Sequence, residues 1–466
     1  MKKKQLRWTL WTIASPFILF IILCILIYLP PIQNFLVDKA AVYASEATGM
    51  NISVGRISLS FPLNLVVTDV DAASPHKDTL LSVRRLQVNV QLLPLLKKQV
   101  EVDGISLQGA TVNSNDLIHG MRLNGTLGEL FISSHGVALD PETAIVNKVL
   151  LKDTDLSLCL NDTAAADTAA SDPTYWKIIL QDIDLQNVSF ALDMPLDSLS
   201  LAASLDNATL RDGLIDLHKS AYSLQTFRIK NGRVRYDSGR PSATASADSL
   251  SAGLDPSHIA LTDIGVKLDS LYYEGRNMKA VISQFVLKER SGVEIVSTEG
   301  RLVSNDKVLR VPSLKLETRD SYLELNAAMD WDALDFKKEG LVSARLMADI
   351  GKPDVVRFMG SMDEKFIRKY PSEPLRIRTG IDGDLNKLKL TTLTAELPGA
   401  LELFAKGELT SLTDSLLRGG DITLQAETKD LKFISTLAEG IEIPYGTRLE
   451  LSLIHISEPT RLALIS

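Results

Sequence analysis

The feature that most constrains this chain is an alternation of apolar and polar residues that begins near Asn51 and recurs to the end. Residues 52–61 and 81–90 show it clearly, with Ile, Val and Leu separated by Ser, Arg, Gln and Asn. Successive side chains of a strand point to opposite faces, so a period of two buries one face and exposes the other to water. The pattern predicts a mainly β fold in which residues 50–450 form an elongated body of short strands, with few short helices.

One interval, residues 354–370, has a helical period instead of an alternating one. Its apolar residues fall on one side of a helix, and they are Val355, Phe358, Met359, Met362 and Phe366. We therefore expect a helix within the β body at this point.

A local pattern recurs in five strand-like runs. Apolar residues stand at relative positions zero, three, five and ten, and Gly, Asn or Asp stands at position seven. The residues at position seven are Gly109, Asp153, Asn187, Asn231 and Gly275. These residue types tolerate a left-handed backbone, and the apolar parity changes at each of them, so we expect a turn or bulge there. About three matches are expected by chance on such a composition, which leaves a true repeat open.

Residues 10–29 form an almost unbroken apolar run that contains 13 Leu, Ile or Phe residues. Twenty residues of helix extend about 30 Å, which is the thickness of a bilayer core. Basic residues are concentrated in residues 1–9, and few follow the run closely, so the positive-inside rule predicts a cytoplasmic N-terminus and an external body. A cleaved signal peptide is the alternative, but the run is long and ends in Tyr28, Leu29, Pro30 and Pro31 without a small-residue cleavage site.

Residues 32–49 follow this predicted membrane anchor. Phe35, Leu36, Lys39 and Val42 lie at helical spacing, and Gly49 is a typical residue for the end of a helix. This segment is predicted to be a short amphipathic helix that links the anchor to the β body.

Motifs for catalysis or for metal binding are missing. The six histidines are scattered, no two of them have metal-ligand spacing, and no phosphate-binding or nucleophile-elbow motif occurs. Residues 382–393 begin like a calcium loop but lack its glycine and its final glutamate. We therefore expect no enzyme activity, no cofactor, no metal site and no catalytic residue. The net charge of −8 argues against a nucleic-acid partner.

The last residues, 451–466, have a separate origin in this interpretation. Residues 451–461 resemble the in-frame translation of a transposase adaptor used in DNA library preparation. We therefore expect natural sequence to end near Glu450, and the tail to be adaptor-derived.

The chain resembles the AsmA/TamB family of bacterial envelope proteins. The resemblance begins with the single apolar run and its following helix, and it is strongest before Asn115. It covers residues 47–59, 65–70, 79–83, 92–96 and 100–112, and later the short glycine-led units at 380–385 and 407–412. The large body favours the TamB-like branch, although the C-terminal domain expected of that branch does not occur in this sequence.

The resemblance implies stacked strands curled into an open, taco-like groove with an apolar lining. It implies an inner-membrane protein with one pass and a periplasmic body, which moves phospholipid toward the outer membrane. An alternative implied role is assembly of outer-membrane proteins with an Omp85-type barrel, and a non-transporting scaffold is a third. The candidate lining residues for phospholipid acyl chains are Ile105, Leu107, Ile183, Leu185, Phe227 and Ile229.

Overall fold

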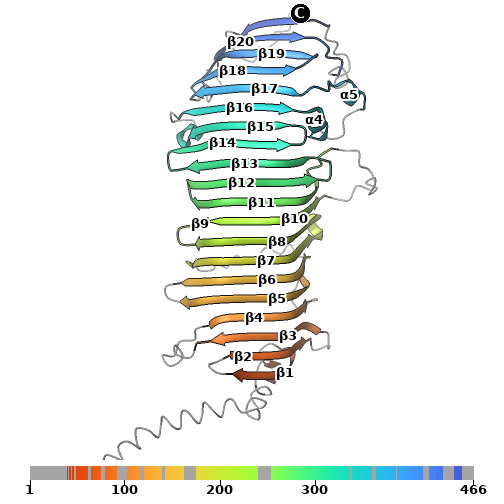
Figure 1. The fold of residues 1–466 in the computed structure, drawn as a ribbon, viewed down its shortest axis with the longest axis vertical. Coiled ribbons are helices and arrows are strands. Elements are labelled where there is room, and N and C mark those ends of the chain that lie inside the picture. Colours follow the sequence, from red (N-terminus) through yellow and green to blue (C-terminus); the bar gives the residue numbers. More distant parts are fainter. Residues whose placement is uncertain are drawn as a thin grey trace, which may run out of the picture. The chain divides into compact units, whose positions relative to one another are not determined.

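The computed structural model of the chain is mainly β, as the alternating pattern predicts (Figure 1). It describes residues 39, 41–42, 45–46, 49–60, 64–74, 79–91, 102–114, 120–138, 142–161, 175–239, 253–335, 338, 340–358, 364–384, 386–412, 419–433 and 445–453. The chain divides into two compact units, residues 1–209 and 210–466.

The first unit is a sheet whose neighbouring strands follow the order of the chain. Its strands are β1 (Asn51–Ser60), β2 (Asn64–Ala73), β3 (Thr79–Val90), β4 (Val102–Asn113), β5 (Met121–Ala138), β6 (Thr143–Leu160) and β7 (Lys177–Met194), followed by the turn η1 (Pro195–Asp197) and the start of β8 (Leu199–Asp216). Each pair from β1 to β6 is antiparallel, whereas β6 and β7 are parallel.

The second unit, taken by itself, is also built from antiparallel pairs of neighbouring strands. After the end of β8, its strands are β9 (Ala221–Leu224), β10 (Thr226–Ser238), β11 (His258–Glu274), β12 (Asn277–Glu289), β13 (Glu294–Ser304), β14 (Val308–Thr318), β15 (Tyr322–Asp330), β16 (Val342–Ile350), β17 (Leu375–Gly383), β18 (Lys387–Leu397), β19 (Leu401–Thr410), β20 (Gly419–Thr428) and β21 (Arg448–Leu453). Its helical elements are η2 (Trp331–Leu334), α4 (Lys352–Phe358) and α5 (Glu364–Lys369).

The predicted helix over residues 354–370 is present as two short helices, α4 and α5, and residues 359–363 between them lie outside the described residues. Phe366 of α5 is 2% exposed and belongs to a compact core with Tyr370, Leu397, Ala400, Leu431 and Phe433. Val355 of α4 packs against this core, but Phe358 is 55% exposed. The helical period is therefore confirmed over residues 354–358 and 364–369, and its apolar side is buried at Phe366 but not at Phe358.

The predicted left-handed positions are confirmed. All five have positive φ, from 49° at Asp153 to 61° at Gly109. Four of them lie inside strands, whereas Gly275 lies in the tight turn between Glu274 of β11 and Asn277 of β12. The fifth match is therefore a hairpin turn, and the left-handed residue inside β11 is Asp263, with φ 51°.

Both ends of the chain extend beyond what the structure describes. Residues 1–38, with the predicted basic tail and membrane anchor, and residues 454–466 lie outside the described residues. Within the described part of the chain, no helix has the length and apolar character needed to cross a bilayer. Lys39, Ala41, Val42, Ser45 and Glu46 are helical, and the N–H of Gly49 donates to the carbonyl of Ser45 at 2.9 Å. Leu451 to Leu453, from the adaptor-like segment, continue β21 beside β20.

Candidate functional site

Two rows of aliphatic side chains cross the first unit from β1 to β7. The inner row consists of Ile57, Val67, Leu86, Leu107, Leu130, Leu151 and Leu185, each directly opposite the next. The outer row consists of Leu59, Leu65, Val88, Ile105, Ile132, Val149 and Ile183, paired in the same way. Paired residues, and residues two apart in a strand, share a face of the sheet, so both rows form one apolar face.

Four of the six predicted lining residues belong to these rows. Leu107 and Leu185 lie in the inner row, and Ile105 and Ile183 lie in the outer row. Every side chain of both rows is half-buried, and none is fully buried. Side chains in a closed core would lose nearly all of their exposure, because interiors are packed as densely as organic crystals.

A line of kinks borders the inner row. The crease line consists of Gly55, Asp69, Arg84, Gly109, Gly128, Asp153 and Asn187, which stand opposite one another without being paired in the ladder. Asp69, Gly109, Asp153 and Asn187 have positive φ. A left-handed residue inside a strand bends it and changes which residues face a given side.

The crease line has its side chains on one side of the sheet. A Cβ added to Gly109 would lie 3.2 Å from Cβ of Arg84, and a Cβ added to Gly128 would lie 2.8 Å from Cβ of Asp153. Asn187 Nδ2 donates to Asp153 Oδ1 at 2.9 Å. At the crease line the alternation of side chains between the two faces is interrupted. Each strand therefore presents two consecutive polar or glycine residues, such as Gln108 and Gly109, on one face. Its apolar residues on either side, such as Leu107 and Ala110, stay on the other face.

Beyond the crease line a further row crosses the same seven strands. This far row consists of Val54, Val70, Val83, Ala110, Leu127, Thr154 and Val188. It contains the best-buried side chains next to the crease, with Val83 at 7%, Ala110 at 8% and Thr154 at 2% exposure. Three side chains of the far row are therefore more deeply buried than any side chain of the inner and outer rows.

The opposite face of the first unit is polar beside the crease. The residues that follow the inner row toward the crease line are Arg56, Thr68, Arg85, Gln108, Glu129, Lys152 and Gln186, again directly paired. Beside the crease line the sheet is thus amphipathic, with an aliphatic side and a polar side. The aliphatic rows contain no titratable group, so their chemistry is limited to contact with apolar groups.

The remaining two predicted lining residues belong to the second unit. Phe227 of β10 pairs with Leu268 of β11, and Ile229 pairs with Val266, which in turn pairs with Phe285 of β12. Another row, apolar except for one threonine, crosses β14 to β20, and it consists of Leu314, Leu325, Leu346, Thr379, Leu393, Ala405 and Leu424. Each unit therefore has its own apolar face, and the six predicted residues divide between them.

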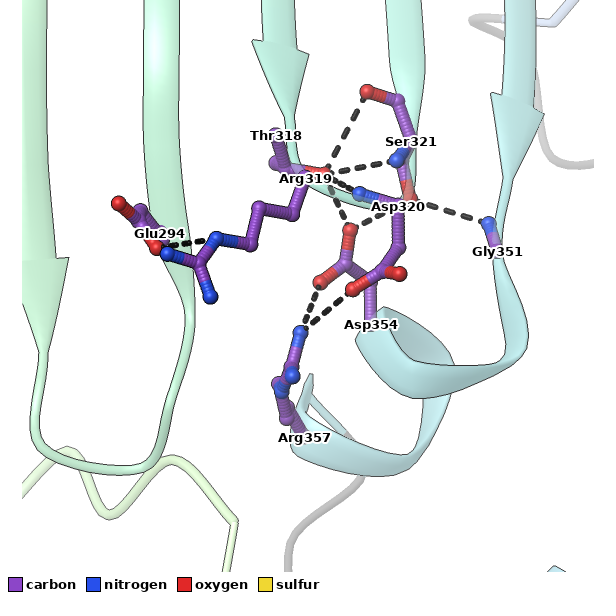
Figure 2. Close-up of polar contacts among 8 residues, drawn as sticks. All are labelled: Glu294, Thr318, Arg319, Asp320, Ser321, Gly351, Asp354 and Arg357. Carbon is purple, nitrogen blue, oxygen red and sulfur yellow. Dashed lines mark hydrogen bonds and ion pairs between the residues drawn. The ribbon is translucent and has the colours of Figure 1, made fainter.

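A polar cluster fixes α4 to the strand ends of the second unit (Figure 2). Asp354 is 1% exposed and accepts hydrogen bonds from Thr318 Oγ1 and, at 2.6 Å, from Ser321 Oγ. Arg357 Nη1 lies 3.1 Å from Asp354 Oδ1 and 2.8 Å from Asp320 Oδ2. The buried carboxylate is satisfied on both oxygens, so we assign the cluster a structural role.

A second buried carboxylate holds the turn between β12 and β13. Burial by itself raises the pKa of Glu289, but hydrogen bonds from the backbone N–H groups of Ser291, Ala260 and Arg290 outweigh it, so the pKa is lowered. Within this turn, the N–H of Ser291 donates to Oε2 of Glu289. The residue is thus held ionised at the end of β12.

Sequence reasoning identified part of the crease line. The shared spacing identified Gly109, Asp153 and Asn187, whereas Asp69, in a strand of the same kind, was missed. The change of parity between Val67 and Val70 was the available signal for Asp69. Gly55, Arg84 and Gly128 have ordinary φ, and only the ladder shows that they belong to the line.

Among the described residues, no group of three or more His, Cys, Asp or Glu side chains is placed to hold a metal ion. The structure thus offers one kind of candidate site, an aliphatic face bordered by polar residues. Comparison with known proteins adds nothing to this, since no protein-family model matches the chain and no curated protein matches it significantly.

Proposed function

We propose that the chain is an inner-membrane-anchored periplasmic protein that carries phospholipid along an open apolar β-groove. In this proposal the inner, outer and far rows line the groove in the first unit, and the backbone bends at the crease line, whose side chains lie on the opposite face. Residues 10–29 supply the anchor. The resemblance to the AsmA/TamB family supports the same role.

The observation that carries the proposal is the pair of unbroken aliphatic rows with uniformly half-buried side chains. Seven strands spaced about 4.8 Å apart give an apolar strip that is about 29 Å long in the direction perpendicular to the strands. An acyl chain that leaves water for such a strip gains about 0.8 kcal/mol for each buried CH₂. Contact along the strip is equivalent from strand to strand, so a chain can move along it without meeting a polar barrier.

The test is a single charge introduced into the inner row of the full chain. We expect Leu107→Glu to abolish photo-crosslinking of lipid to a crosslinker at Ile105, because an unpaired charge beside hydrocarbon costs several kcal/mol. We expect the melting temperature to change little, because a half-buried side chain can reach water.

The matched control is Gln108→Glu, which places the same charge one residue away on the polar, exposed side of the strand. It should leave both lipid crosslinking and melting unchanged. A large fall in the melting temperature of Leu107→Glu would indicate a closed core. No lipid crosslink in the unmutated protein would remove the conduit and leave a scaffold or assembly role.

A further inference from the structure

The polar face of β10 carries a row of cations. Its exposed basic residues are Arg228, Lys230, Arg233 and Arg235. Alternation alone would divide them between two faces, but Asn231, with φ 54°, changes the parity of the strand between Lys230 and Arg233. All four therefore lie on the face opposite to Phe227 and Ile229.

Glycine 232 supports this placement. A Cβ added to Gly232 would lie 3.2 Å from Cγ2 of Ile229 and 3.2 Å from Cβ of Ile264. Gly232 thus lies on the apolar face together with Ile229, and its neighbour Arg233 points the other way. The register shifts on both sides of Gly232 mark the same kink in the ladder with β11.

The neighbouring strand adds a cation to the row. Lys267 of β11 stands directly opposite Arg228. Like charges in directly opposite positions destabilise a sheet. Within the described ranges, no ion pair is formed by Arg228, Lys230 or Lys267, whereas Arg235 Nε lies 2.7 Å from Asp237 Oδ2. This concentration of positive charge occurs in a chain whose net charge is −8.

We propose that this basic strip, made of Arg228, Lys230, Arg233, Arg235 and Lys267, binds the anionic surface of a phospholipid bilayer. The four cations of β10 extend over about 24 Å of strand, an open row that fits an extended surface of phosphates better than one enclosed ion. Lys and Arg near an anionic membrane each contribute to adsorption. The acidic remainder of the chain opposes this weakly, because charges beyond about 10 Å are screened at 0.1 M salt.

The basic strip is independent of the proposed conduit, because it lies on the opposite face from Phe227 and Ile229. The experiment uses the full chain held in nanodiscs of pure phosphatidylcholine. Binding is measured to separate vesicles made of equal parts of phosphatidylglycerol and phosphatidylcholine, and to vesicles of phosphatidylcholine alone. We expect binding to the anionic vesicles only, with an affinity that falls as salt is raised.

The variant that removes the unpaired cations is the triple change Arg228→Glu, Lys230→Glu and Lys267→Glu. Each cation near such a surface is worth about fivefold in affinity, so the triple variant should bind at least about 100-fold more weakly. The matched control is Arg310→Glu, Arg345→Glu and Lys406→Glu, which changes the net charge equally at exposed positions on three separate strands. It should lose no more than a few-fold, and both variants should keep the melting temperature of the unmutated chain.

Several outcomes would overturn the proposal. Equal losses in the two variants would show a general effect of net charge. Absence of binding to anionic vesicles by the unmutated chain would exclude a bilayer partner. Tighter binding of inorganic polyphosphate or of duplex DNA, in competition with the vesicles, would assign the strip to a soluble polyanion. Because lipid crosslinking at Ile105 should persist in the triple variant, failure here is distinguishable from failure of the conduit.

Discussion

The two units use different strands to build an apolar face. In the first unit, β5, β6 and β7 each have 18 residues and cross the crease line near their middle. In the second unit, β15, β16 and β17 each have nine residues, pair without register shifts, and keep one parity throughout. A left-handed residue lets a strand keep one face apolar around a bend, as Asp153 does in β6 and Asp263 does in β11, whereas β15 and β16 contain no left-handed residue.

The second unit gains its stability differently from the first. Its short strands meet the helices α4 and α5, and the buried side chains of Phe366, Tyr370, Leu397, Ala400, Leu431 and Phe433 form a compact cluster there. In the first unit the members of the inner and outer rows all stay half-buried, and buried side chains such as Val83 and Ala110 occur in the far row. One region thus has a compact cluster of buried side chains beside its helices, whereas the other has a bent ladder whose inner and outer rows stay partly exposed.

The largest expected effect comes from breaking the closed core. Phe366→Ala should cost about 3–5 kcal/mol, because the ring is 2% exposed and contacts Tyr370 and Phe433 with ring centroids 5.6 and 5.8 Å away. Leu107→Ala in the inner row should cost only about 1–2 kcal/mol, because its side chain is half-buried. Hydrogen exchange resolved by strand measures each loss locally. Equal costs would mean that the inner row is part of a closed core.

The next effect comes from changing the crease line. Gly109→Val should cost about 1–3 kcal/mol, because φ of 61° is strained for a β-branched residue and a Cβ would press on Arg84. Gly109→Asn is the control, since Asn tolerates this conformation better and replaces glycine with another side chain. Faster hydrogen exchange in β3 to β5 should follow the Val variant. A harmless Val variant would show that the crease does not need a left-handed residue.

The smallest effect concerns pH and the turn between β12 and β13. The pKa of Glu289 is lowered from 4.5 in the folded chain, so its stabilisation is fully present above that value and is lost as pH falls below it through the lowered pKa. Melting temperatures measured from neutral pH downward should fall less steeply in Glu289→Gln than in the unmutated chain. Parallel curves would show that this carboxylate does not contribute to the acid sensitivity.

The comparison also shows what sequence reasoning could reach. Period-two alternation predicted the β body, and residue type with parity predicted left-handed positions at Gly109, Asp153, Asn187 and Asn231, because both signals are local. The same signals could not distinguish a kink from a hairpin turn at Gly275, since both need positive φ.

The rows themselves lay beyond the reach of the sequence. Leu107 meets Leu86 and Leu130 through cross-strand register, which depends on turn lengths and on hydrogen bonds between segments. The carboxylate of Asp354 depends on Thr318 and Ser321, more than thirty residues away, so no spacing rule could indicate it. Alternation showed that an apolar face exists, and only the ladder showed which side chains adjoin.

The crease line has a consequence for how the first unit reaches its fold. Every strand from β1 to β7 must place one particular residue on that line, so a slip of a single residue would misplace a kink in two neighbours at once. Each strand that has formed therefore pairs with the next strand in only one register. Since partners are adjacent in the chain, growth can proceed as a zipper from the first strand onward, in the order in which a polypeptide is synthesised.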